Sequence, residues 1–369
     1  MGRRIGTFVL ASALAVSGAA WAQASKSPLD ASRLAGLVGV YAPGEADSTV
    51  VLTTQETGPL RTVRQTVRRH GPWVRIDTLD RDVTCTRYVH RPSGLTVDVG
   101  TGYFSMNRPT LVAETTDYRS VPTGRTLQVA GETCQEWDVY RGMEGGQPTY
   151  RRLGCVAADG MELSSHTVGR SGASLGQATT AISVSRSPVS PSEVQPPTSL
   201  DPIVWAPPTP ARDGWEVVLS SDSGGVRTVR ARGAWRYQET RRPDGARDIS
   251  SNLASAGFQA QASIDREGVP ITVSIMARPP VALDGERPLD RPRETVLGQT
   301  CAWYDSMPLV SDAFRHECRT ADGVVLRMAE GGRGRSGATY VAITLIDKPP
   351  AVAQMMPPAT LFDLAAWLP

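Results

Sequence analysis

The side chains best suited to nucleophilic or metal chemistry in this sequence are its five cysteines and four histidines. Four cysteines form two pairs, Cys134 with Cys155 and Cys301 with Cys318. No C-x-x-C motif and no histidine spacing completes a zinc site around them. Each pair is flanked by strand-like segments with a turn between them, so we expect the two cysteines to face each other across a hairpin. The sequence thus predicts two structural disulfides, no metal and no cofactor.

The fifth cysteine, Cys85, has no counterpart in the second half of the chain. A catalytic thiol needs an activating partner. The nearest histidine, His90, is five residues away, and an odd spacing on one strand places the two side chains on opposite faces. We therefore favour a buried free thiol, and a secreted hydrolase stays a remote alternative.

The other candidate motifs are better explained as turns and loops. Segment 169–172 (GRSG) is not the G-x-S-x-G of a nucleophile elbow. The Asp-Gly pairs at 159–160 and 322–323 follow strand-like segments and are typical of tight turns. Glycine-rich segment 331–334 lacks the lysine and hydroxyl residue of a phosphate-binding loop. We predict a protein with no catalytic activity.

The cysteine pairs belong to a duplication that runs through most of the chain. The two copies match in one order at nearly one offset: 50–54 with 217–221, 61–64 with 227–230, Trp73 with Trp235, 95–99 with 271–275, and Cys134 with Cys301. A proline-rich tail ending in tryptophan closes both copies, at 196–207 and 357–369. We predict two β domains, residues 46–207 (the first repeat) and 208–369 (the second repeat).

Strict alternation of apolar and polar residues indicates that these repeats are built from half-buried strands. Sparse aromatics and abundant glycine and proline also favour short strands and turns over long helices. The clearest alternation gives one apolar face, which turns toward either a core or a cavity. Its residues are Leu95, Val97, Val99, Ile271, Val273 and Ile275. We expect a mainly β (β-rich α+β) chain with few helices, each repeat forming one antiparallel sheet.

The N-terminus predicts export. Arginines at 3 and 4, an apolar run and an Ala-x-Ala site make residues 1–22 a signal peptide, cleaved between Ala22 and Gln23. Segment 23–45 reads as a helix that either packs on the first sheet or covers a cavity. No later stretch is long and apolar enough to span a membrane. Cleavage lowers the formal charge from +2 to 0, which excludes a basic surface for nucleic acid. The leader and the arginine-rich composition favour a Gram-negative periplasmic protein.

One motif combination carries a family resemblance. The pattern is G-x-x-C followed by C-x-x-x-D-G, then a strand and a proline-rich tail, and it occurs at 131–160 and again at 298–323. It resembles uncharacterised periplasmic members of the outer-membrane lipoprotein carrier (LolA-like) superfamily. The resemblance implies two tandem curved half-barrel sheets whose concave faces can hold acyl chains.

The resemblance leaves three functional hypotheses. The first is a non-enzymatic periplasmic binding protein that holds a lipid or a lipidated partner on the apolar face defined above. In the second, these residues are only the ordinary core beneath a helix. The third is an envelope protein-interaction or stress-sensing module without a small-molecule ligand.

Overall fold

The computed structural model describes residues 46–56, 61–80, 83–108, 118–144, 147–169, 174–206, 213–277, 286–306, 313–332 and 337–368. The predicted signal peptide (1–22) and helix (23–45) lie outside the described residues. Within these ranges, none of the helices has the length and apolar character needed to cross a membrane.

Strands joined by short turns make up most of the described chain. The first repeat contributes β1 (Ser48–Glu56), β2 (Arg61–His70), β3 (Trp73–Asp80), β4 (Val83–His90), β5 (Leu95–Gly100), β6 (Tyr103–Asn107), β7 (Tyr118–Val129), β8 (Glu132–Glu144), β9 (Gln147–Ala157), β10 (Glu162–Val168) and β11 (Ser174–Ser185). The second repeat contributes β12 (Gly214–Ser221), β13 (Val226–Arg232), β14 (Trp235–Arg241), β15 (Arg247–Leu253), β16 (Phe258–Ile264), β17 (Pro270–Ala277), β18 (Arg287–Pro288), β19 (Glu294–Val296), β20 (Gln299–Asp305), β21 (Ala313–Arg319), β22 (Val325–Gly332) and β23 (Ala338–Ile346).

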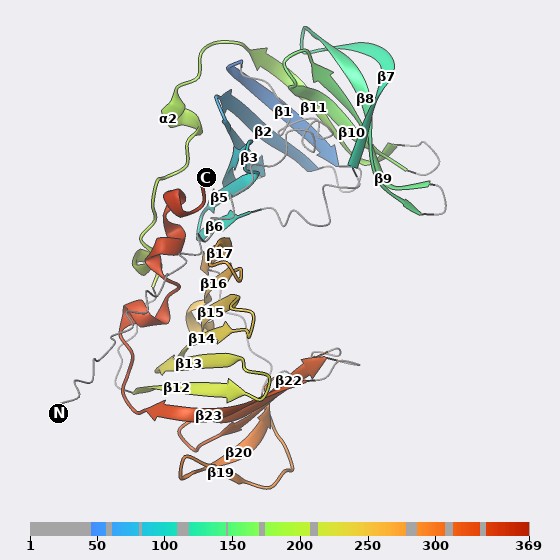
Figure 1. Cartoon of the computed structure of the whole chain (residues 1–369). Coiled ribbons are helices and arrows are strands. Elements are labelled where there is room, and N and C mark those ends of the chain that lie inside the picture. The colour runs from blue at the N-terminus through green and yellow to red at the C-terminus, as the bar shows by residue number, and fades with distance from the viewer. Residues whose placement is uncertain are drawn as a thin grey trace, which may run out of the picture.

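All of these strands belong to one antiparallel sheet that does not close on itself (Figure 1). In space the order is β7-β8-β9-β10-β11-β1-β2-β3-β4-β5-β6, then β17-β16-β15-β14-β13-β12-β23-β22-β21-β20, with β18 and β19 both on β20. The mainly β fold class is therefore confirmed. The two predicted sheets, however, are continuous, because the edge strand β6 of the first repeat pairs with the edge strand β17 of the second.

The register of this junction is self-complementary. Ser105 lies opposite Ser274 at its centre, and Met106 and Phe104 lie opposite Val273 and Ile275 on one face. Two equivalent edges that pair in this way are related by a local two-fold axis, as in an isologous dimer interface. The duplication has thus produced within one chain the arrangement that two separate copies would form.

The junction also corrects one part of the sequence comparison. The match of 95–99 with 271–275 is wrong, because β5 is the fifth strand of its repeat whereas β17 is the sixth of the other. The counterpart of β5 is β16, and that of β6 is β17. Any half-buried strand gives the same alternation, so the pattern alone does not distinguish neighbouring strands of a sheet.

The two proline-rich tails cover one face of the sheet at the junction. The first tail forms α2 (Pro191–Val194) and the 3-10 turn η1 (Pro202–Trp205), and the second forms η3 (Val352–Met355), η4 (Ala359–Phe362) and η5 (Leu364–Ala366). The tails also meet each other, since the Leu200 amide donates to the Phe362 carbonyl at 3.2 Å. Figure 1 shows both along the same side of the central strands. The largest apolar core, which includes residues of both repeats and of both tails, lies beneath them.

Both predicted disulfides are present, each within one hairpin. Cys134–Cys155 joins β8 to β9 and Cys301–Cys318 joins β20 to β21, with Cα–Cα distances of 5.4 and 5.2 Å. The expected register is wrong, because the cysteines are diagonal neighbours. Cys134 lies opposite Ala157, while Cys155 lies opposite Glu136.

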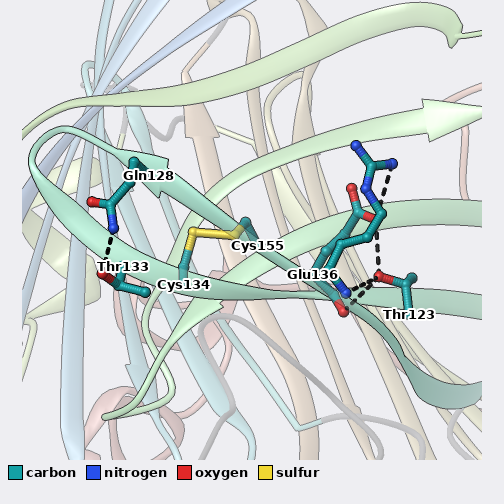
Figure 2. The surroundings of a disulfide bond; sticks show 7 residues. Thr123, Gln128, Thr133, Cys134, Glu136 and Cys155 are labelled. Carbon is teal, nitrogen blue, oxygen red and sulfur yellow. Dashed lines mark hydrogen bonds and ion pairs between the residues drawn. A yellow bond between two sulfur atoms is a disulfide. The ribbon is translucent and has the colours of Figure 1, made fainter.

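Figure 2 shows the first disulfide between two polar contacts of the same sheet edge. Thr123 donates to the Glu136 carboxylate at 2.9 Å, and Gln128 donates to the Thr133 hydroxyl at 2.5 Å. These contacts link β7 to β8 on either side of the disulfide, so the outer strands are fixed to the sheet by more than backbone pairing.

Candidate binding cavity

The apolar face predicted from sequence lies under the tails. Leu95, Val97, Val273 and Ile275 are each at most 1% exposed and belong to the central core. Val99 is partly buried against the same core. Ile271 is half-buried in β17. The structure therefore places these residues beneath covering segments, and the covering segments are proline-rich tails.

A cavity of about 260 Å³ lies instead on the opposite face of the sheet, within the first repeat. On β3, Trp73 belongs to the central core, and the adjacent Val74 packs with Val67, which lines the cavity. Neighbouring strand residues point to opposite faces, so core and cavity are on different sides. The lining comes mainly from β1, β2, β3, β9, β10 and β11: Val50, Leu52, Gln65, Val67, Arg69, Ile76, Arg152, Met161, Glu162, Ser164, Ser165 and Thr179.

The cavity combines apolar walls with one charged group of residues. Val50, Leu52, Val67, Ile76 and Met161 supply aliphatic or thioether surface. Such a surface favours an apolar ligand because it is removed from water on binding.

Two arginines and one glutamate form the charged group, which we call the Arg69–Arg152–Glu162 cluster. Arg152 contacts the Glu162 carboxylate at 2.8 Å. Arg69 is only 3% exposed, and its Nη2 lies 3.5 Å from the Gly160 carbonyl oxygen. Burial lowers the pKa of Arg69 to about 10, so this guanidinium stays protonated at neutral pH.

The pKa of Glu162 is subject to opposing effects, and both arginines contribute to them. Burial raises the pKa of its carboxyl, while Arg152, a hydrogen bond with Ser165 and the charge of Arg69 act in the opposite direction. With Glu162 ionised, the cluster carries a net charge of +1. An anion that entered the cavity would therefore meet excess positive charge in a low-dielectric environment.

At the equivalent place in the second repeat, the described residues include large buried side chains. The strand registers give the correspondence through three cross-strand pairs: Ser48–Arg69 with Trp215–Ala231, Leu52–Gln65 with Leu219–Arg227, and Ser165–Thr179 with Met328–Tyr340. The sequence match of 61–64 with 227–230 is therefore wrong, because residues 65–68 lie at the position of 227–230. Small or polar residues of the first repeat are thus replaced by Trp215, Met328 and Tyr340. These three large side chains are at most 7% exposed and form one continuous core.

Arg227 is also buried in this part of the second repeat. Its guanidinium stacks 4.2 Å from the centre of the Tyr340 ring and pairs with Glu330 at 2.5 Å. Arg315, the counterpart of Arg152, contacts the same carboxylate at 3.2 Å. The second repeat therefore holds the same set of charges, two arginines and one carboxylate, but beside a packed core instead of a cavity.

A separate, polar hollow of about 500 Å³ lies at the end of β12 in the second repeat. It is bordered by Asp213, Asp322 and Asp347 and by Arg236, with Trp215 at its apolar side. The charged rim and the small apolar share distinguish it from the cavity of the first repeat.

The structure gives Cys85 no activating histidine. Cys85 pairs with Thr78, whereas His90 pairs with Trp73 and stacks on its ring at 4.9 Å. Burial raises the pKa of the Cys85 thiol, which favours the protonated and less nucleophilic form. In the part of the chain that the structure describes, no group of three His, Cys, Asp or Glu side chains could hold a metal ion.

Sequence reasoning missed the cavity because it read the positions at which the repeats agree. Arg69, Arg152 and Glu162 belong to none of the motifs or matches drawn from the sequence above. Positions at which the repeats differ in side-chain size, such as Thr179 against Tyr340, carry the signal. These differences in size can be recognised only when the strand registers show which residues correspond.

Comparisons with known proteins return structural similarity only. No family model matches the chain, and no curated protein matches it. Among solved structures, the chain is similar to MucB, with 11% identity and a TM-score of 0.31, over 68% of this chain and 91% of that one.

Two further structures carry the superfamily named above. A LolA superfamily protein from Nitrosomonas europaea is 10% identical with a TM-score of 0.18, over 44% of this chain and 94% of that one. A putative outer membrane lipoprotein-sorting protein domain from Vibrio parahaemolyticus is 10% identical with a TM-score of 0.20, over 64% and 85%. The chain is similar to each of these structures at a low TM-score. We take no functional argument from likenesses at these scores.

Proposed function

We propose that this chain is a non-enzymatic periplasmic binding protein whose ligand is a lipid or the lipid group of a partner. The single observation that supports this function most is the cavity of the first repeat, with aliphatic walls and a charged cluster at one side. Apolar cavities with a few convergent polar groups are the usual form of small-molecule sites. The two disulfides support an oxidising compartment outside the cytoplasm.

Native mass spectrometry of protein purified gently from periplasm tests the proposal. We expect a population whose mass exceeds that of the chain by one lipid-sized ligand, which organic extraction removes and identifies. Ligand-free spectra from every preparation, together with no binding of added lipid, would contradict the proposed function.

A second candidate, an envelope protein-interaction module, has its own observation. Ile182 on β11 and Ile343 on β23 occupy corresponding strands of the two repeats, and both are 57% exposed. Val341 and Ile346 extend the exposed apolar surface of β23. Exposed aliphatic clusters are typical of contact surfaces. Cross-linking in intact cells distinguishes the candidates: a partner whose capture is lost with Ile182→Ser and Ile343→Ser favours this second function.

A further inference from the structure

We infer that the first repeat alone holds the ligand, and that this ligand is a single-chain amphiphile with an anionic head, either a carboxylate or a phosphate monoester. The inference rests on the proposed function and adds to it the repeat that binds and the charge that is recognised. It is carried by the contrast between the two repeats and by the Arg69–Arg152–Glu162 cluster.

The contrast between the repeats assigns the site to one of them. Both repeats have the same strand order, so both had the same concave surface to offer. In the second repeat Met328 and Tyr340 fill it, and Arg227 and Arg315 share the Glu330 carboxylate beside that core. In the first repeat Ser165 and Thr179 stand at those positions and line an open cavity. One copy therefore serves as a packed scaffold while the other keeps room for a ligand.

The charged cluster assigns the head group. Arg69 and Arg152 approach the cavity from β2 and β9, and Glu162 on β10 supplies the one negative charge among the lining residues. Arg152 is paired with Glu162, and the charges acting on Arg69 are those of Arg91, Arg186, Asp159 and Glu162, with Arg186 itself paired with Glu132 and Asp159. Among the residues that line the cavity, two arginines thus face one carboxylate. Buried positive charge in excess is stabilised by a bound anion.

The size of the cavity indicates what kind of apolar group the ligand carries. A volume of about 260 Å³ is just below the usual range for small-molecule sites, roughly 300–1,000 Å³. Its apolar walls are supplied by residues from adjacent strands, Val50, Leu52, Val67 and Ile76 among them. A single alkyl chain suits this space, whereas a diacyl lipid would need a wider opening.

Calorimetric titration of the whole mature chain with three probes of equal chain length tests the inference. The probes are dodecanoate, dodecyl phosphate and the neutral dodecanol. We expect one site per chain, with both anions binding at least about tenfold tighter than dodecanol. The ratio between the two anions distinguishes the carboxylate from the phosphate source.

Two sets of variants locate the site. Ser165→Met with Thr179→Tyr copies the residues of the second repeat into the first and should abolish binding of all three probes. Thr180→Tyr adds the same bulk at the next, exposed residue of β11 and should leave binding unchanged. Arg69→Met should weaken both anions about tenfold and leave dodecanol unaffected, and Glu162→Gln should tighten both anions severalfold.

The outcomes separate the inference from the proposed function. If no probe binds the wild-type chain, both fail. If dodecanol binds as tightly as the anions, or the Ser165→Met/Thr179→Tyr variant binds normally, the inference is overturned while the proposed function stands. Should Arg69→Met not fold, Glu162→Gln decides the head-group charge, because unchanged anion binding in that variant contradicts the cluster's role.

Discussion

At the scale of single residues, the two repeats differ in what surrounds their buried arginine and glutamate side chains. In the first repeat Arg152 pairs with Glu162 beside a cavity, and in the second Arg315 shares Glu330 with the stacked Arg227. A buried ion pair gives little net stability compared with an apolar pair, but removing one partner is costly. The second arrangement is therefore part of a packed region, whereas the first borders a cavity that a ligand could enter.

The contacts of Arg227 with Glu330 and Tyr340 give a stability prediction. Arg227→Ala should lower the free energy of unfolding by about 3 kcal/mol, because it leaves the Glu330 carboxylate without its closest partner and opens space under Tyr340. Arg266→Ala is the matched control, since Arg266 pairs with Glu267 at the surface and should change stability far less. Urea unfolding measures the free energy of unfolding of both variants. Equal losses in the two variants would contradict a structural role for Arg227.

Glu162 gives a pH prediction whose sign follows from its environment. Burial raises the pKa of Glu162 in the folded chain above its ordinary value of 4.5, so the folded state favours the protonated form. The corresponding stability is present below about pH 4.5 and is lost as the pH rises through the folded pKa. The wild type should therefore lose stability relative to Glu162→Gln between pH 4.5 and neutral. Urea unfolding over this range checks it; a difference independent of pH would contradict it.

At the scale of elements, the hairpins at the two ends of the sheet depend on their disulfides. Strands β8–β9 and β20–β21 lie far from the central core, and each hairpin is closed by one bond. Their separations of 21 and 17 residues are of the length at which a cross-link removes substantial entropy from the unfolded chain. The tails have the complementary role, since they cover the centre of the sheet.

Removal of one disulfide measures how much that bond contributes to the free energy of unfolding. Cys301→Ser with Cys318→Ser should lower the free energy of unfolding by about 3 kcal/mol, because the unfolded chain regains the entropy of a closed loop. Cys85→Ser, which removes the free thiol, should have a much smaller effect. Chemical unfolding under non-reducing conditions compares the two, and a loss as large with Cys85→Ser would count against the disulfide's role.

At the scale of the whole molecule, we expect the two repeats to unfold as one cooperative unit. They share the β6–β17 ladder and one core, and Arg108 after β6 donates to the Trp367 carbonyl in the last turn of the second tail at 2.7 Å. Domains with so continuous a core are expected to unfold together.

Differential scanning calorimetry tests this cooperativity. We expect one transition whose calorimetric and van't Hoff enthalpies agree, and Trp367→Ala should shift it as a whole, since a buried tryptophan contributes about 3–5 kcal/mol. Two separate transitions would show that the repeats are independent.

Much of this architecture could be predicted from the sequence, because it depends on local patterns. Cysteine spacing predicted both disulfides, alternation predicted strands, and the repeat predicted a common strand order. The pairing of β6 with β17 could not be predicted, since alternation says which face is apolar and not which strand is the neighbour. The cavity was missed for a related reason: it depends on what Ser165 and Thr179 leave empty, which a pattern of matching residues does not record.

The central claim is that the first repeat holds an apolar ligand in its own cavity. Native mass spectrometry of the wild type and of the Ser165→Met/Thr179→Tyr variant, both purified gently from periplasm, tests it most directly. We predict one lipid-sized adduct on the wild-type chain and none on the folded variant. The same adduct on both proteins, or none on either, would contradict the account.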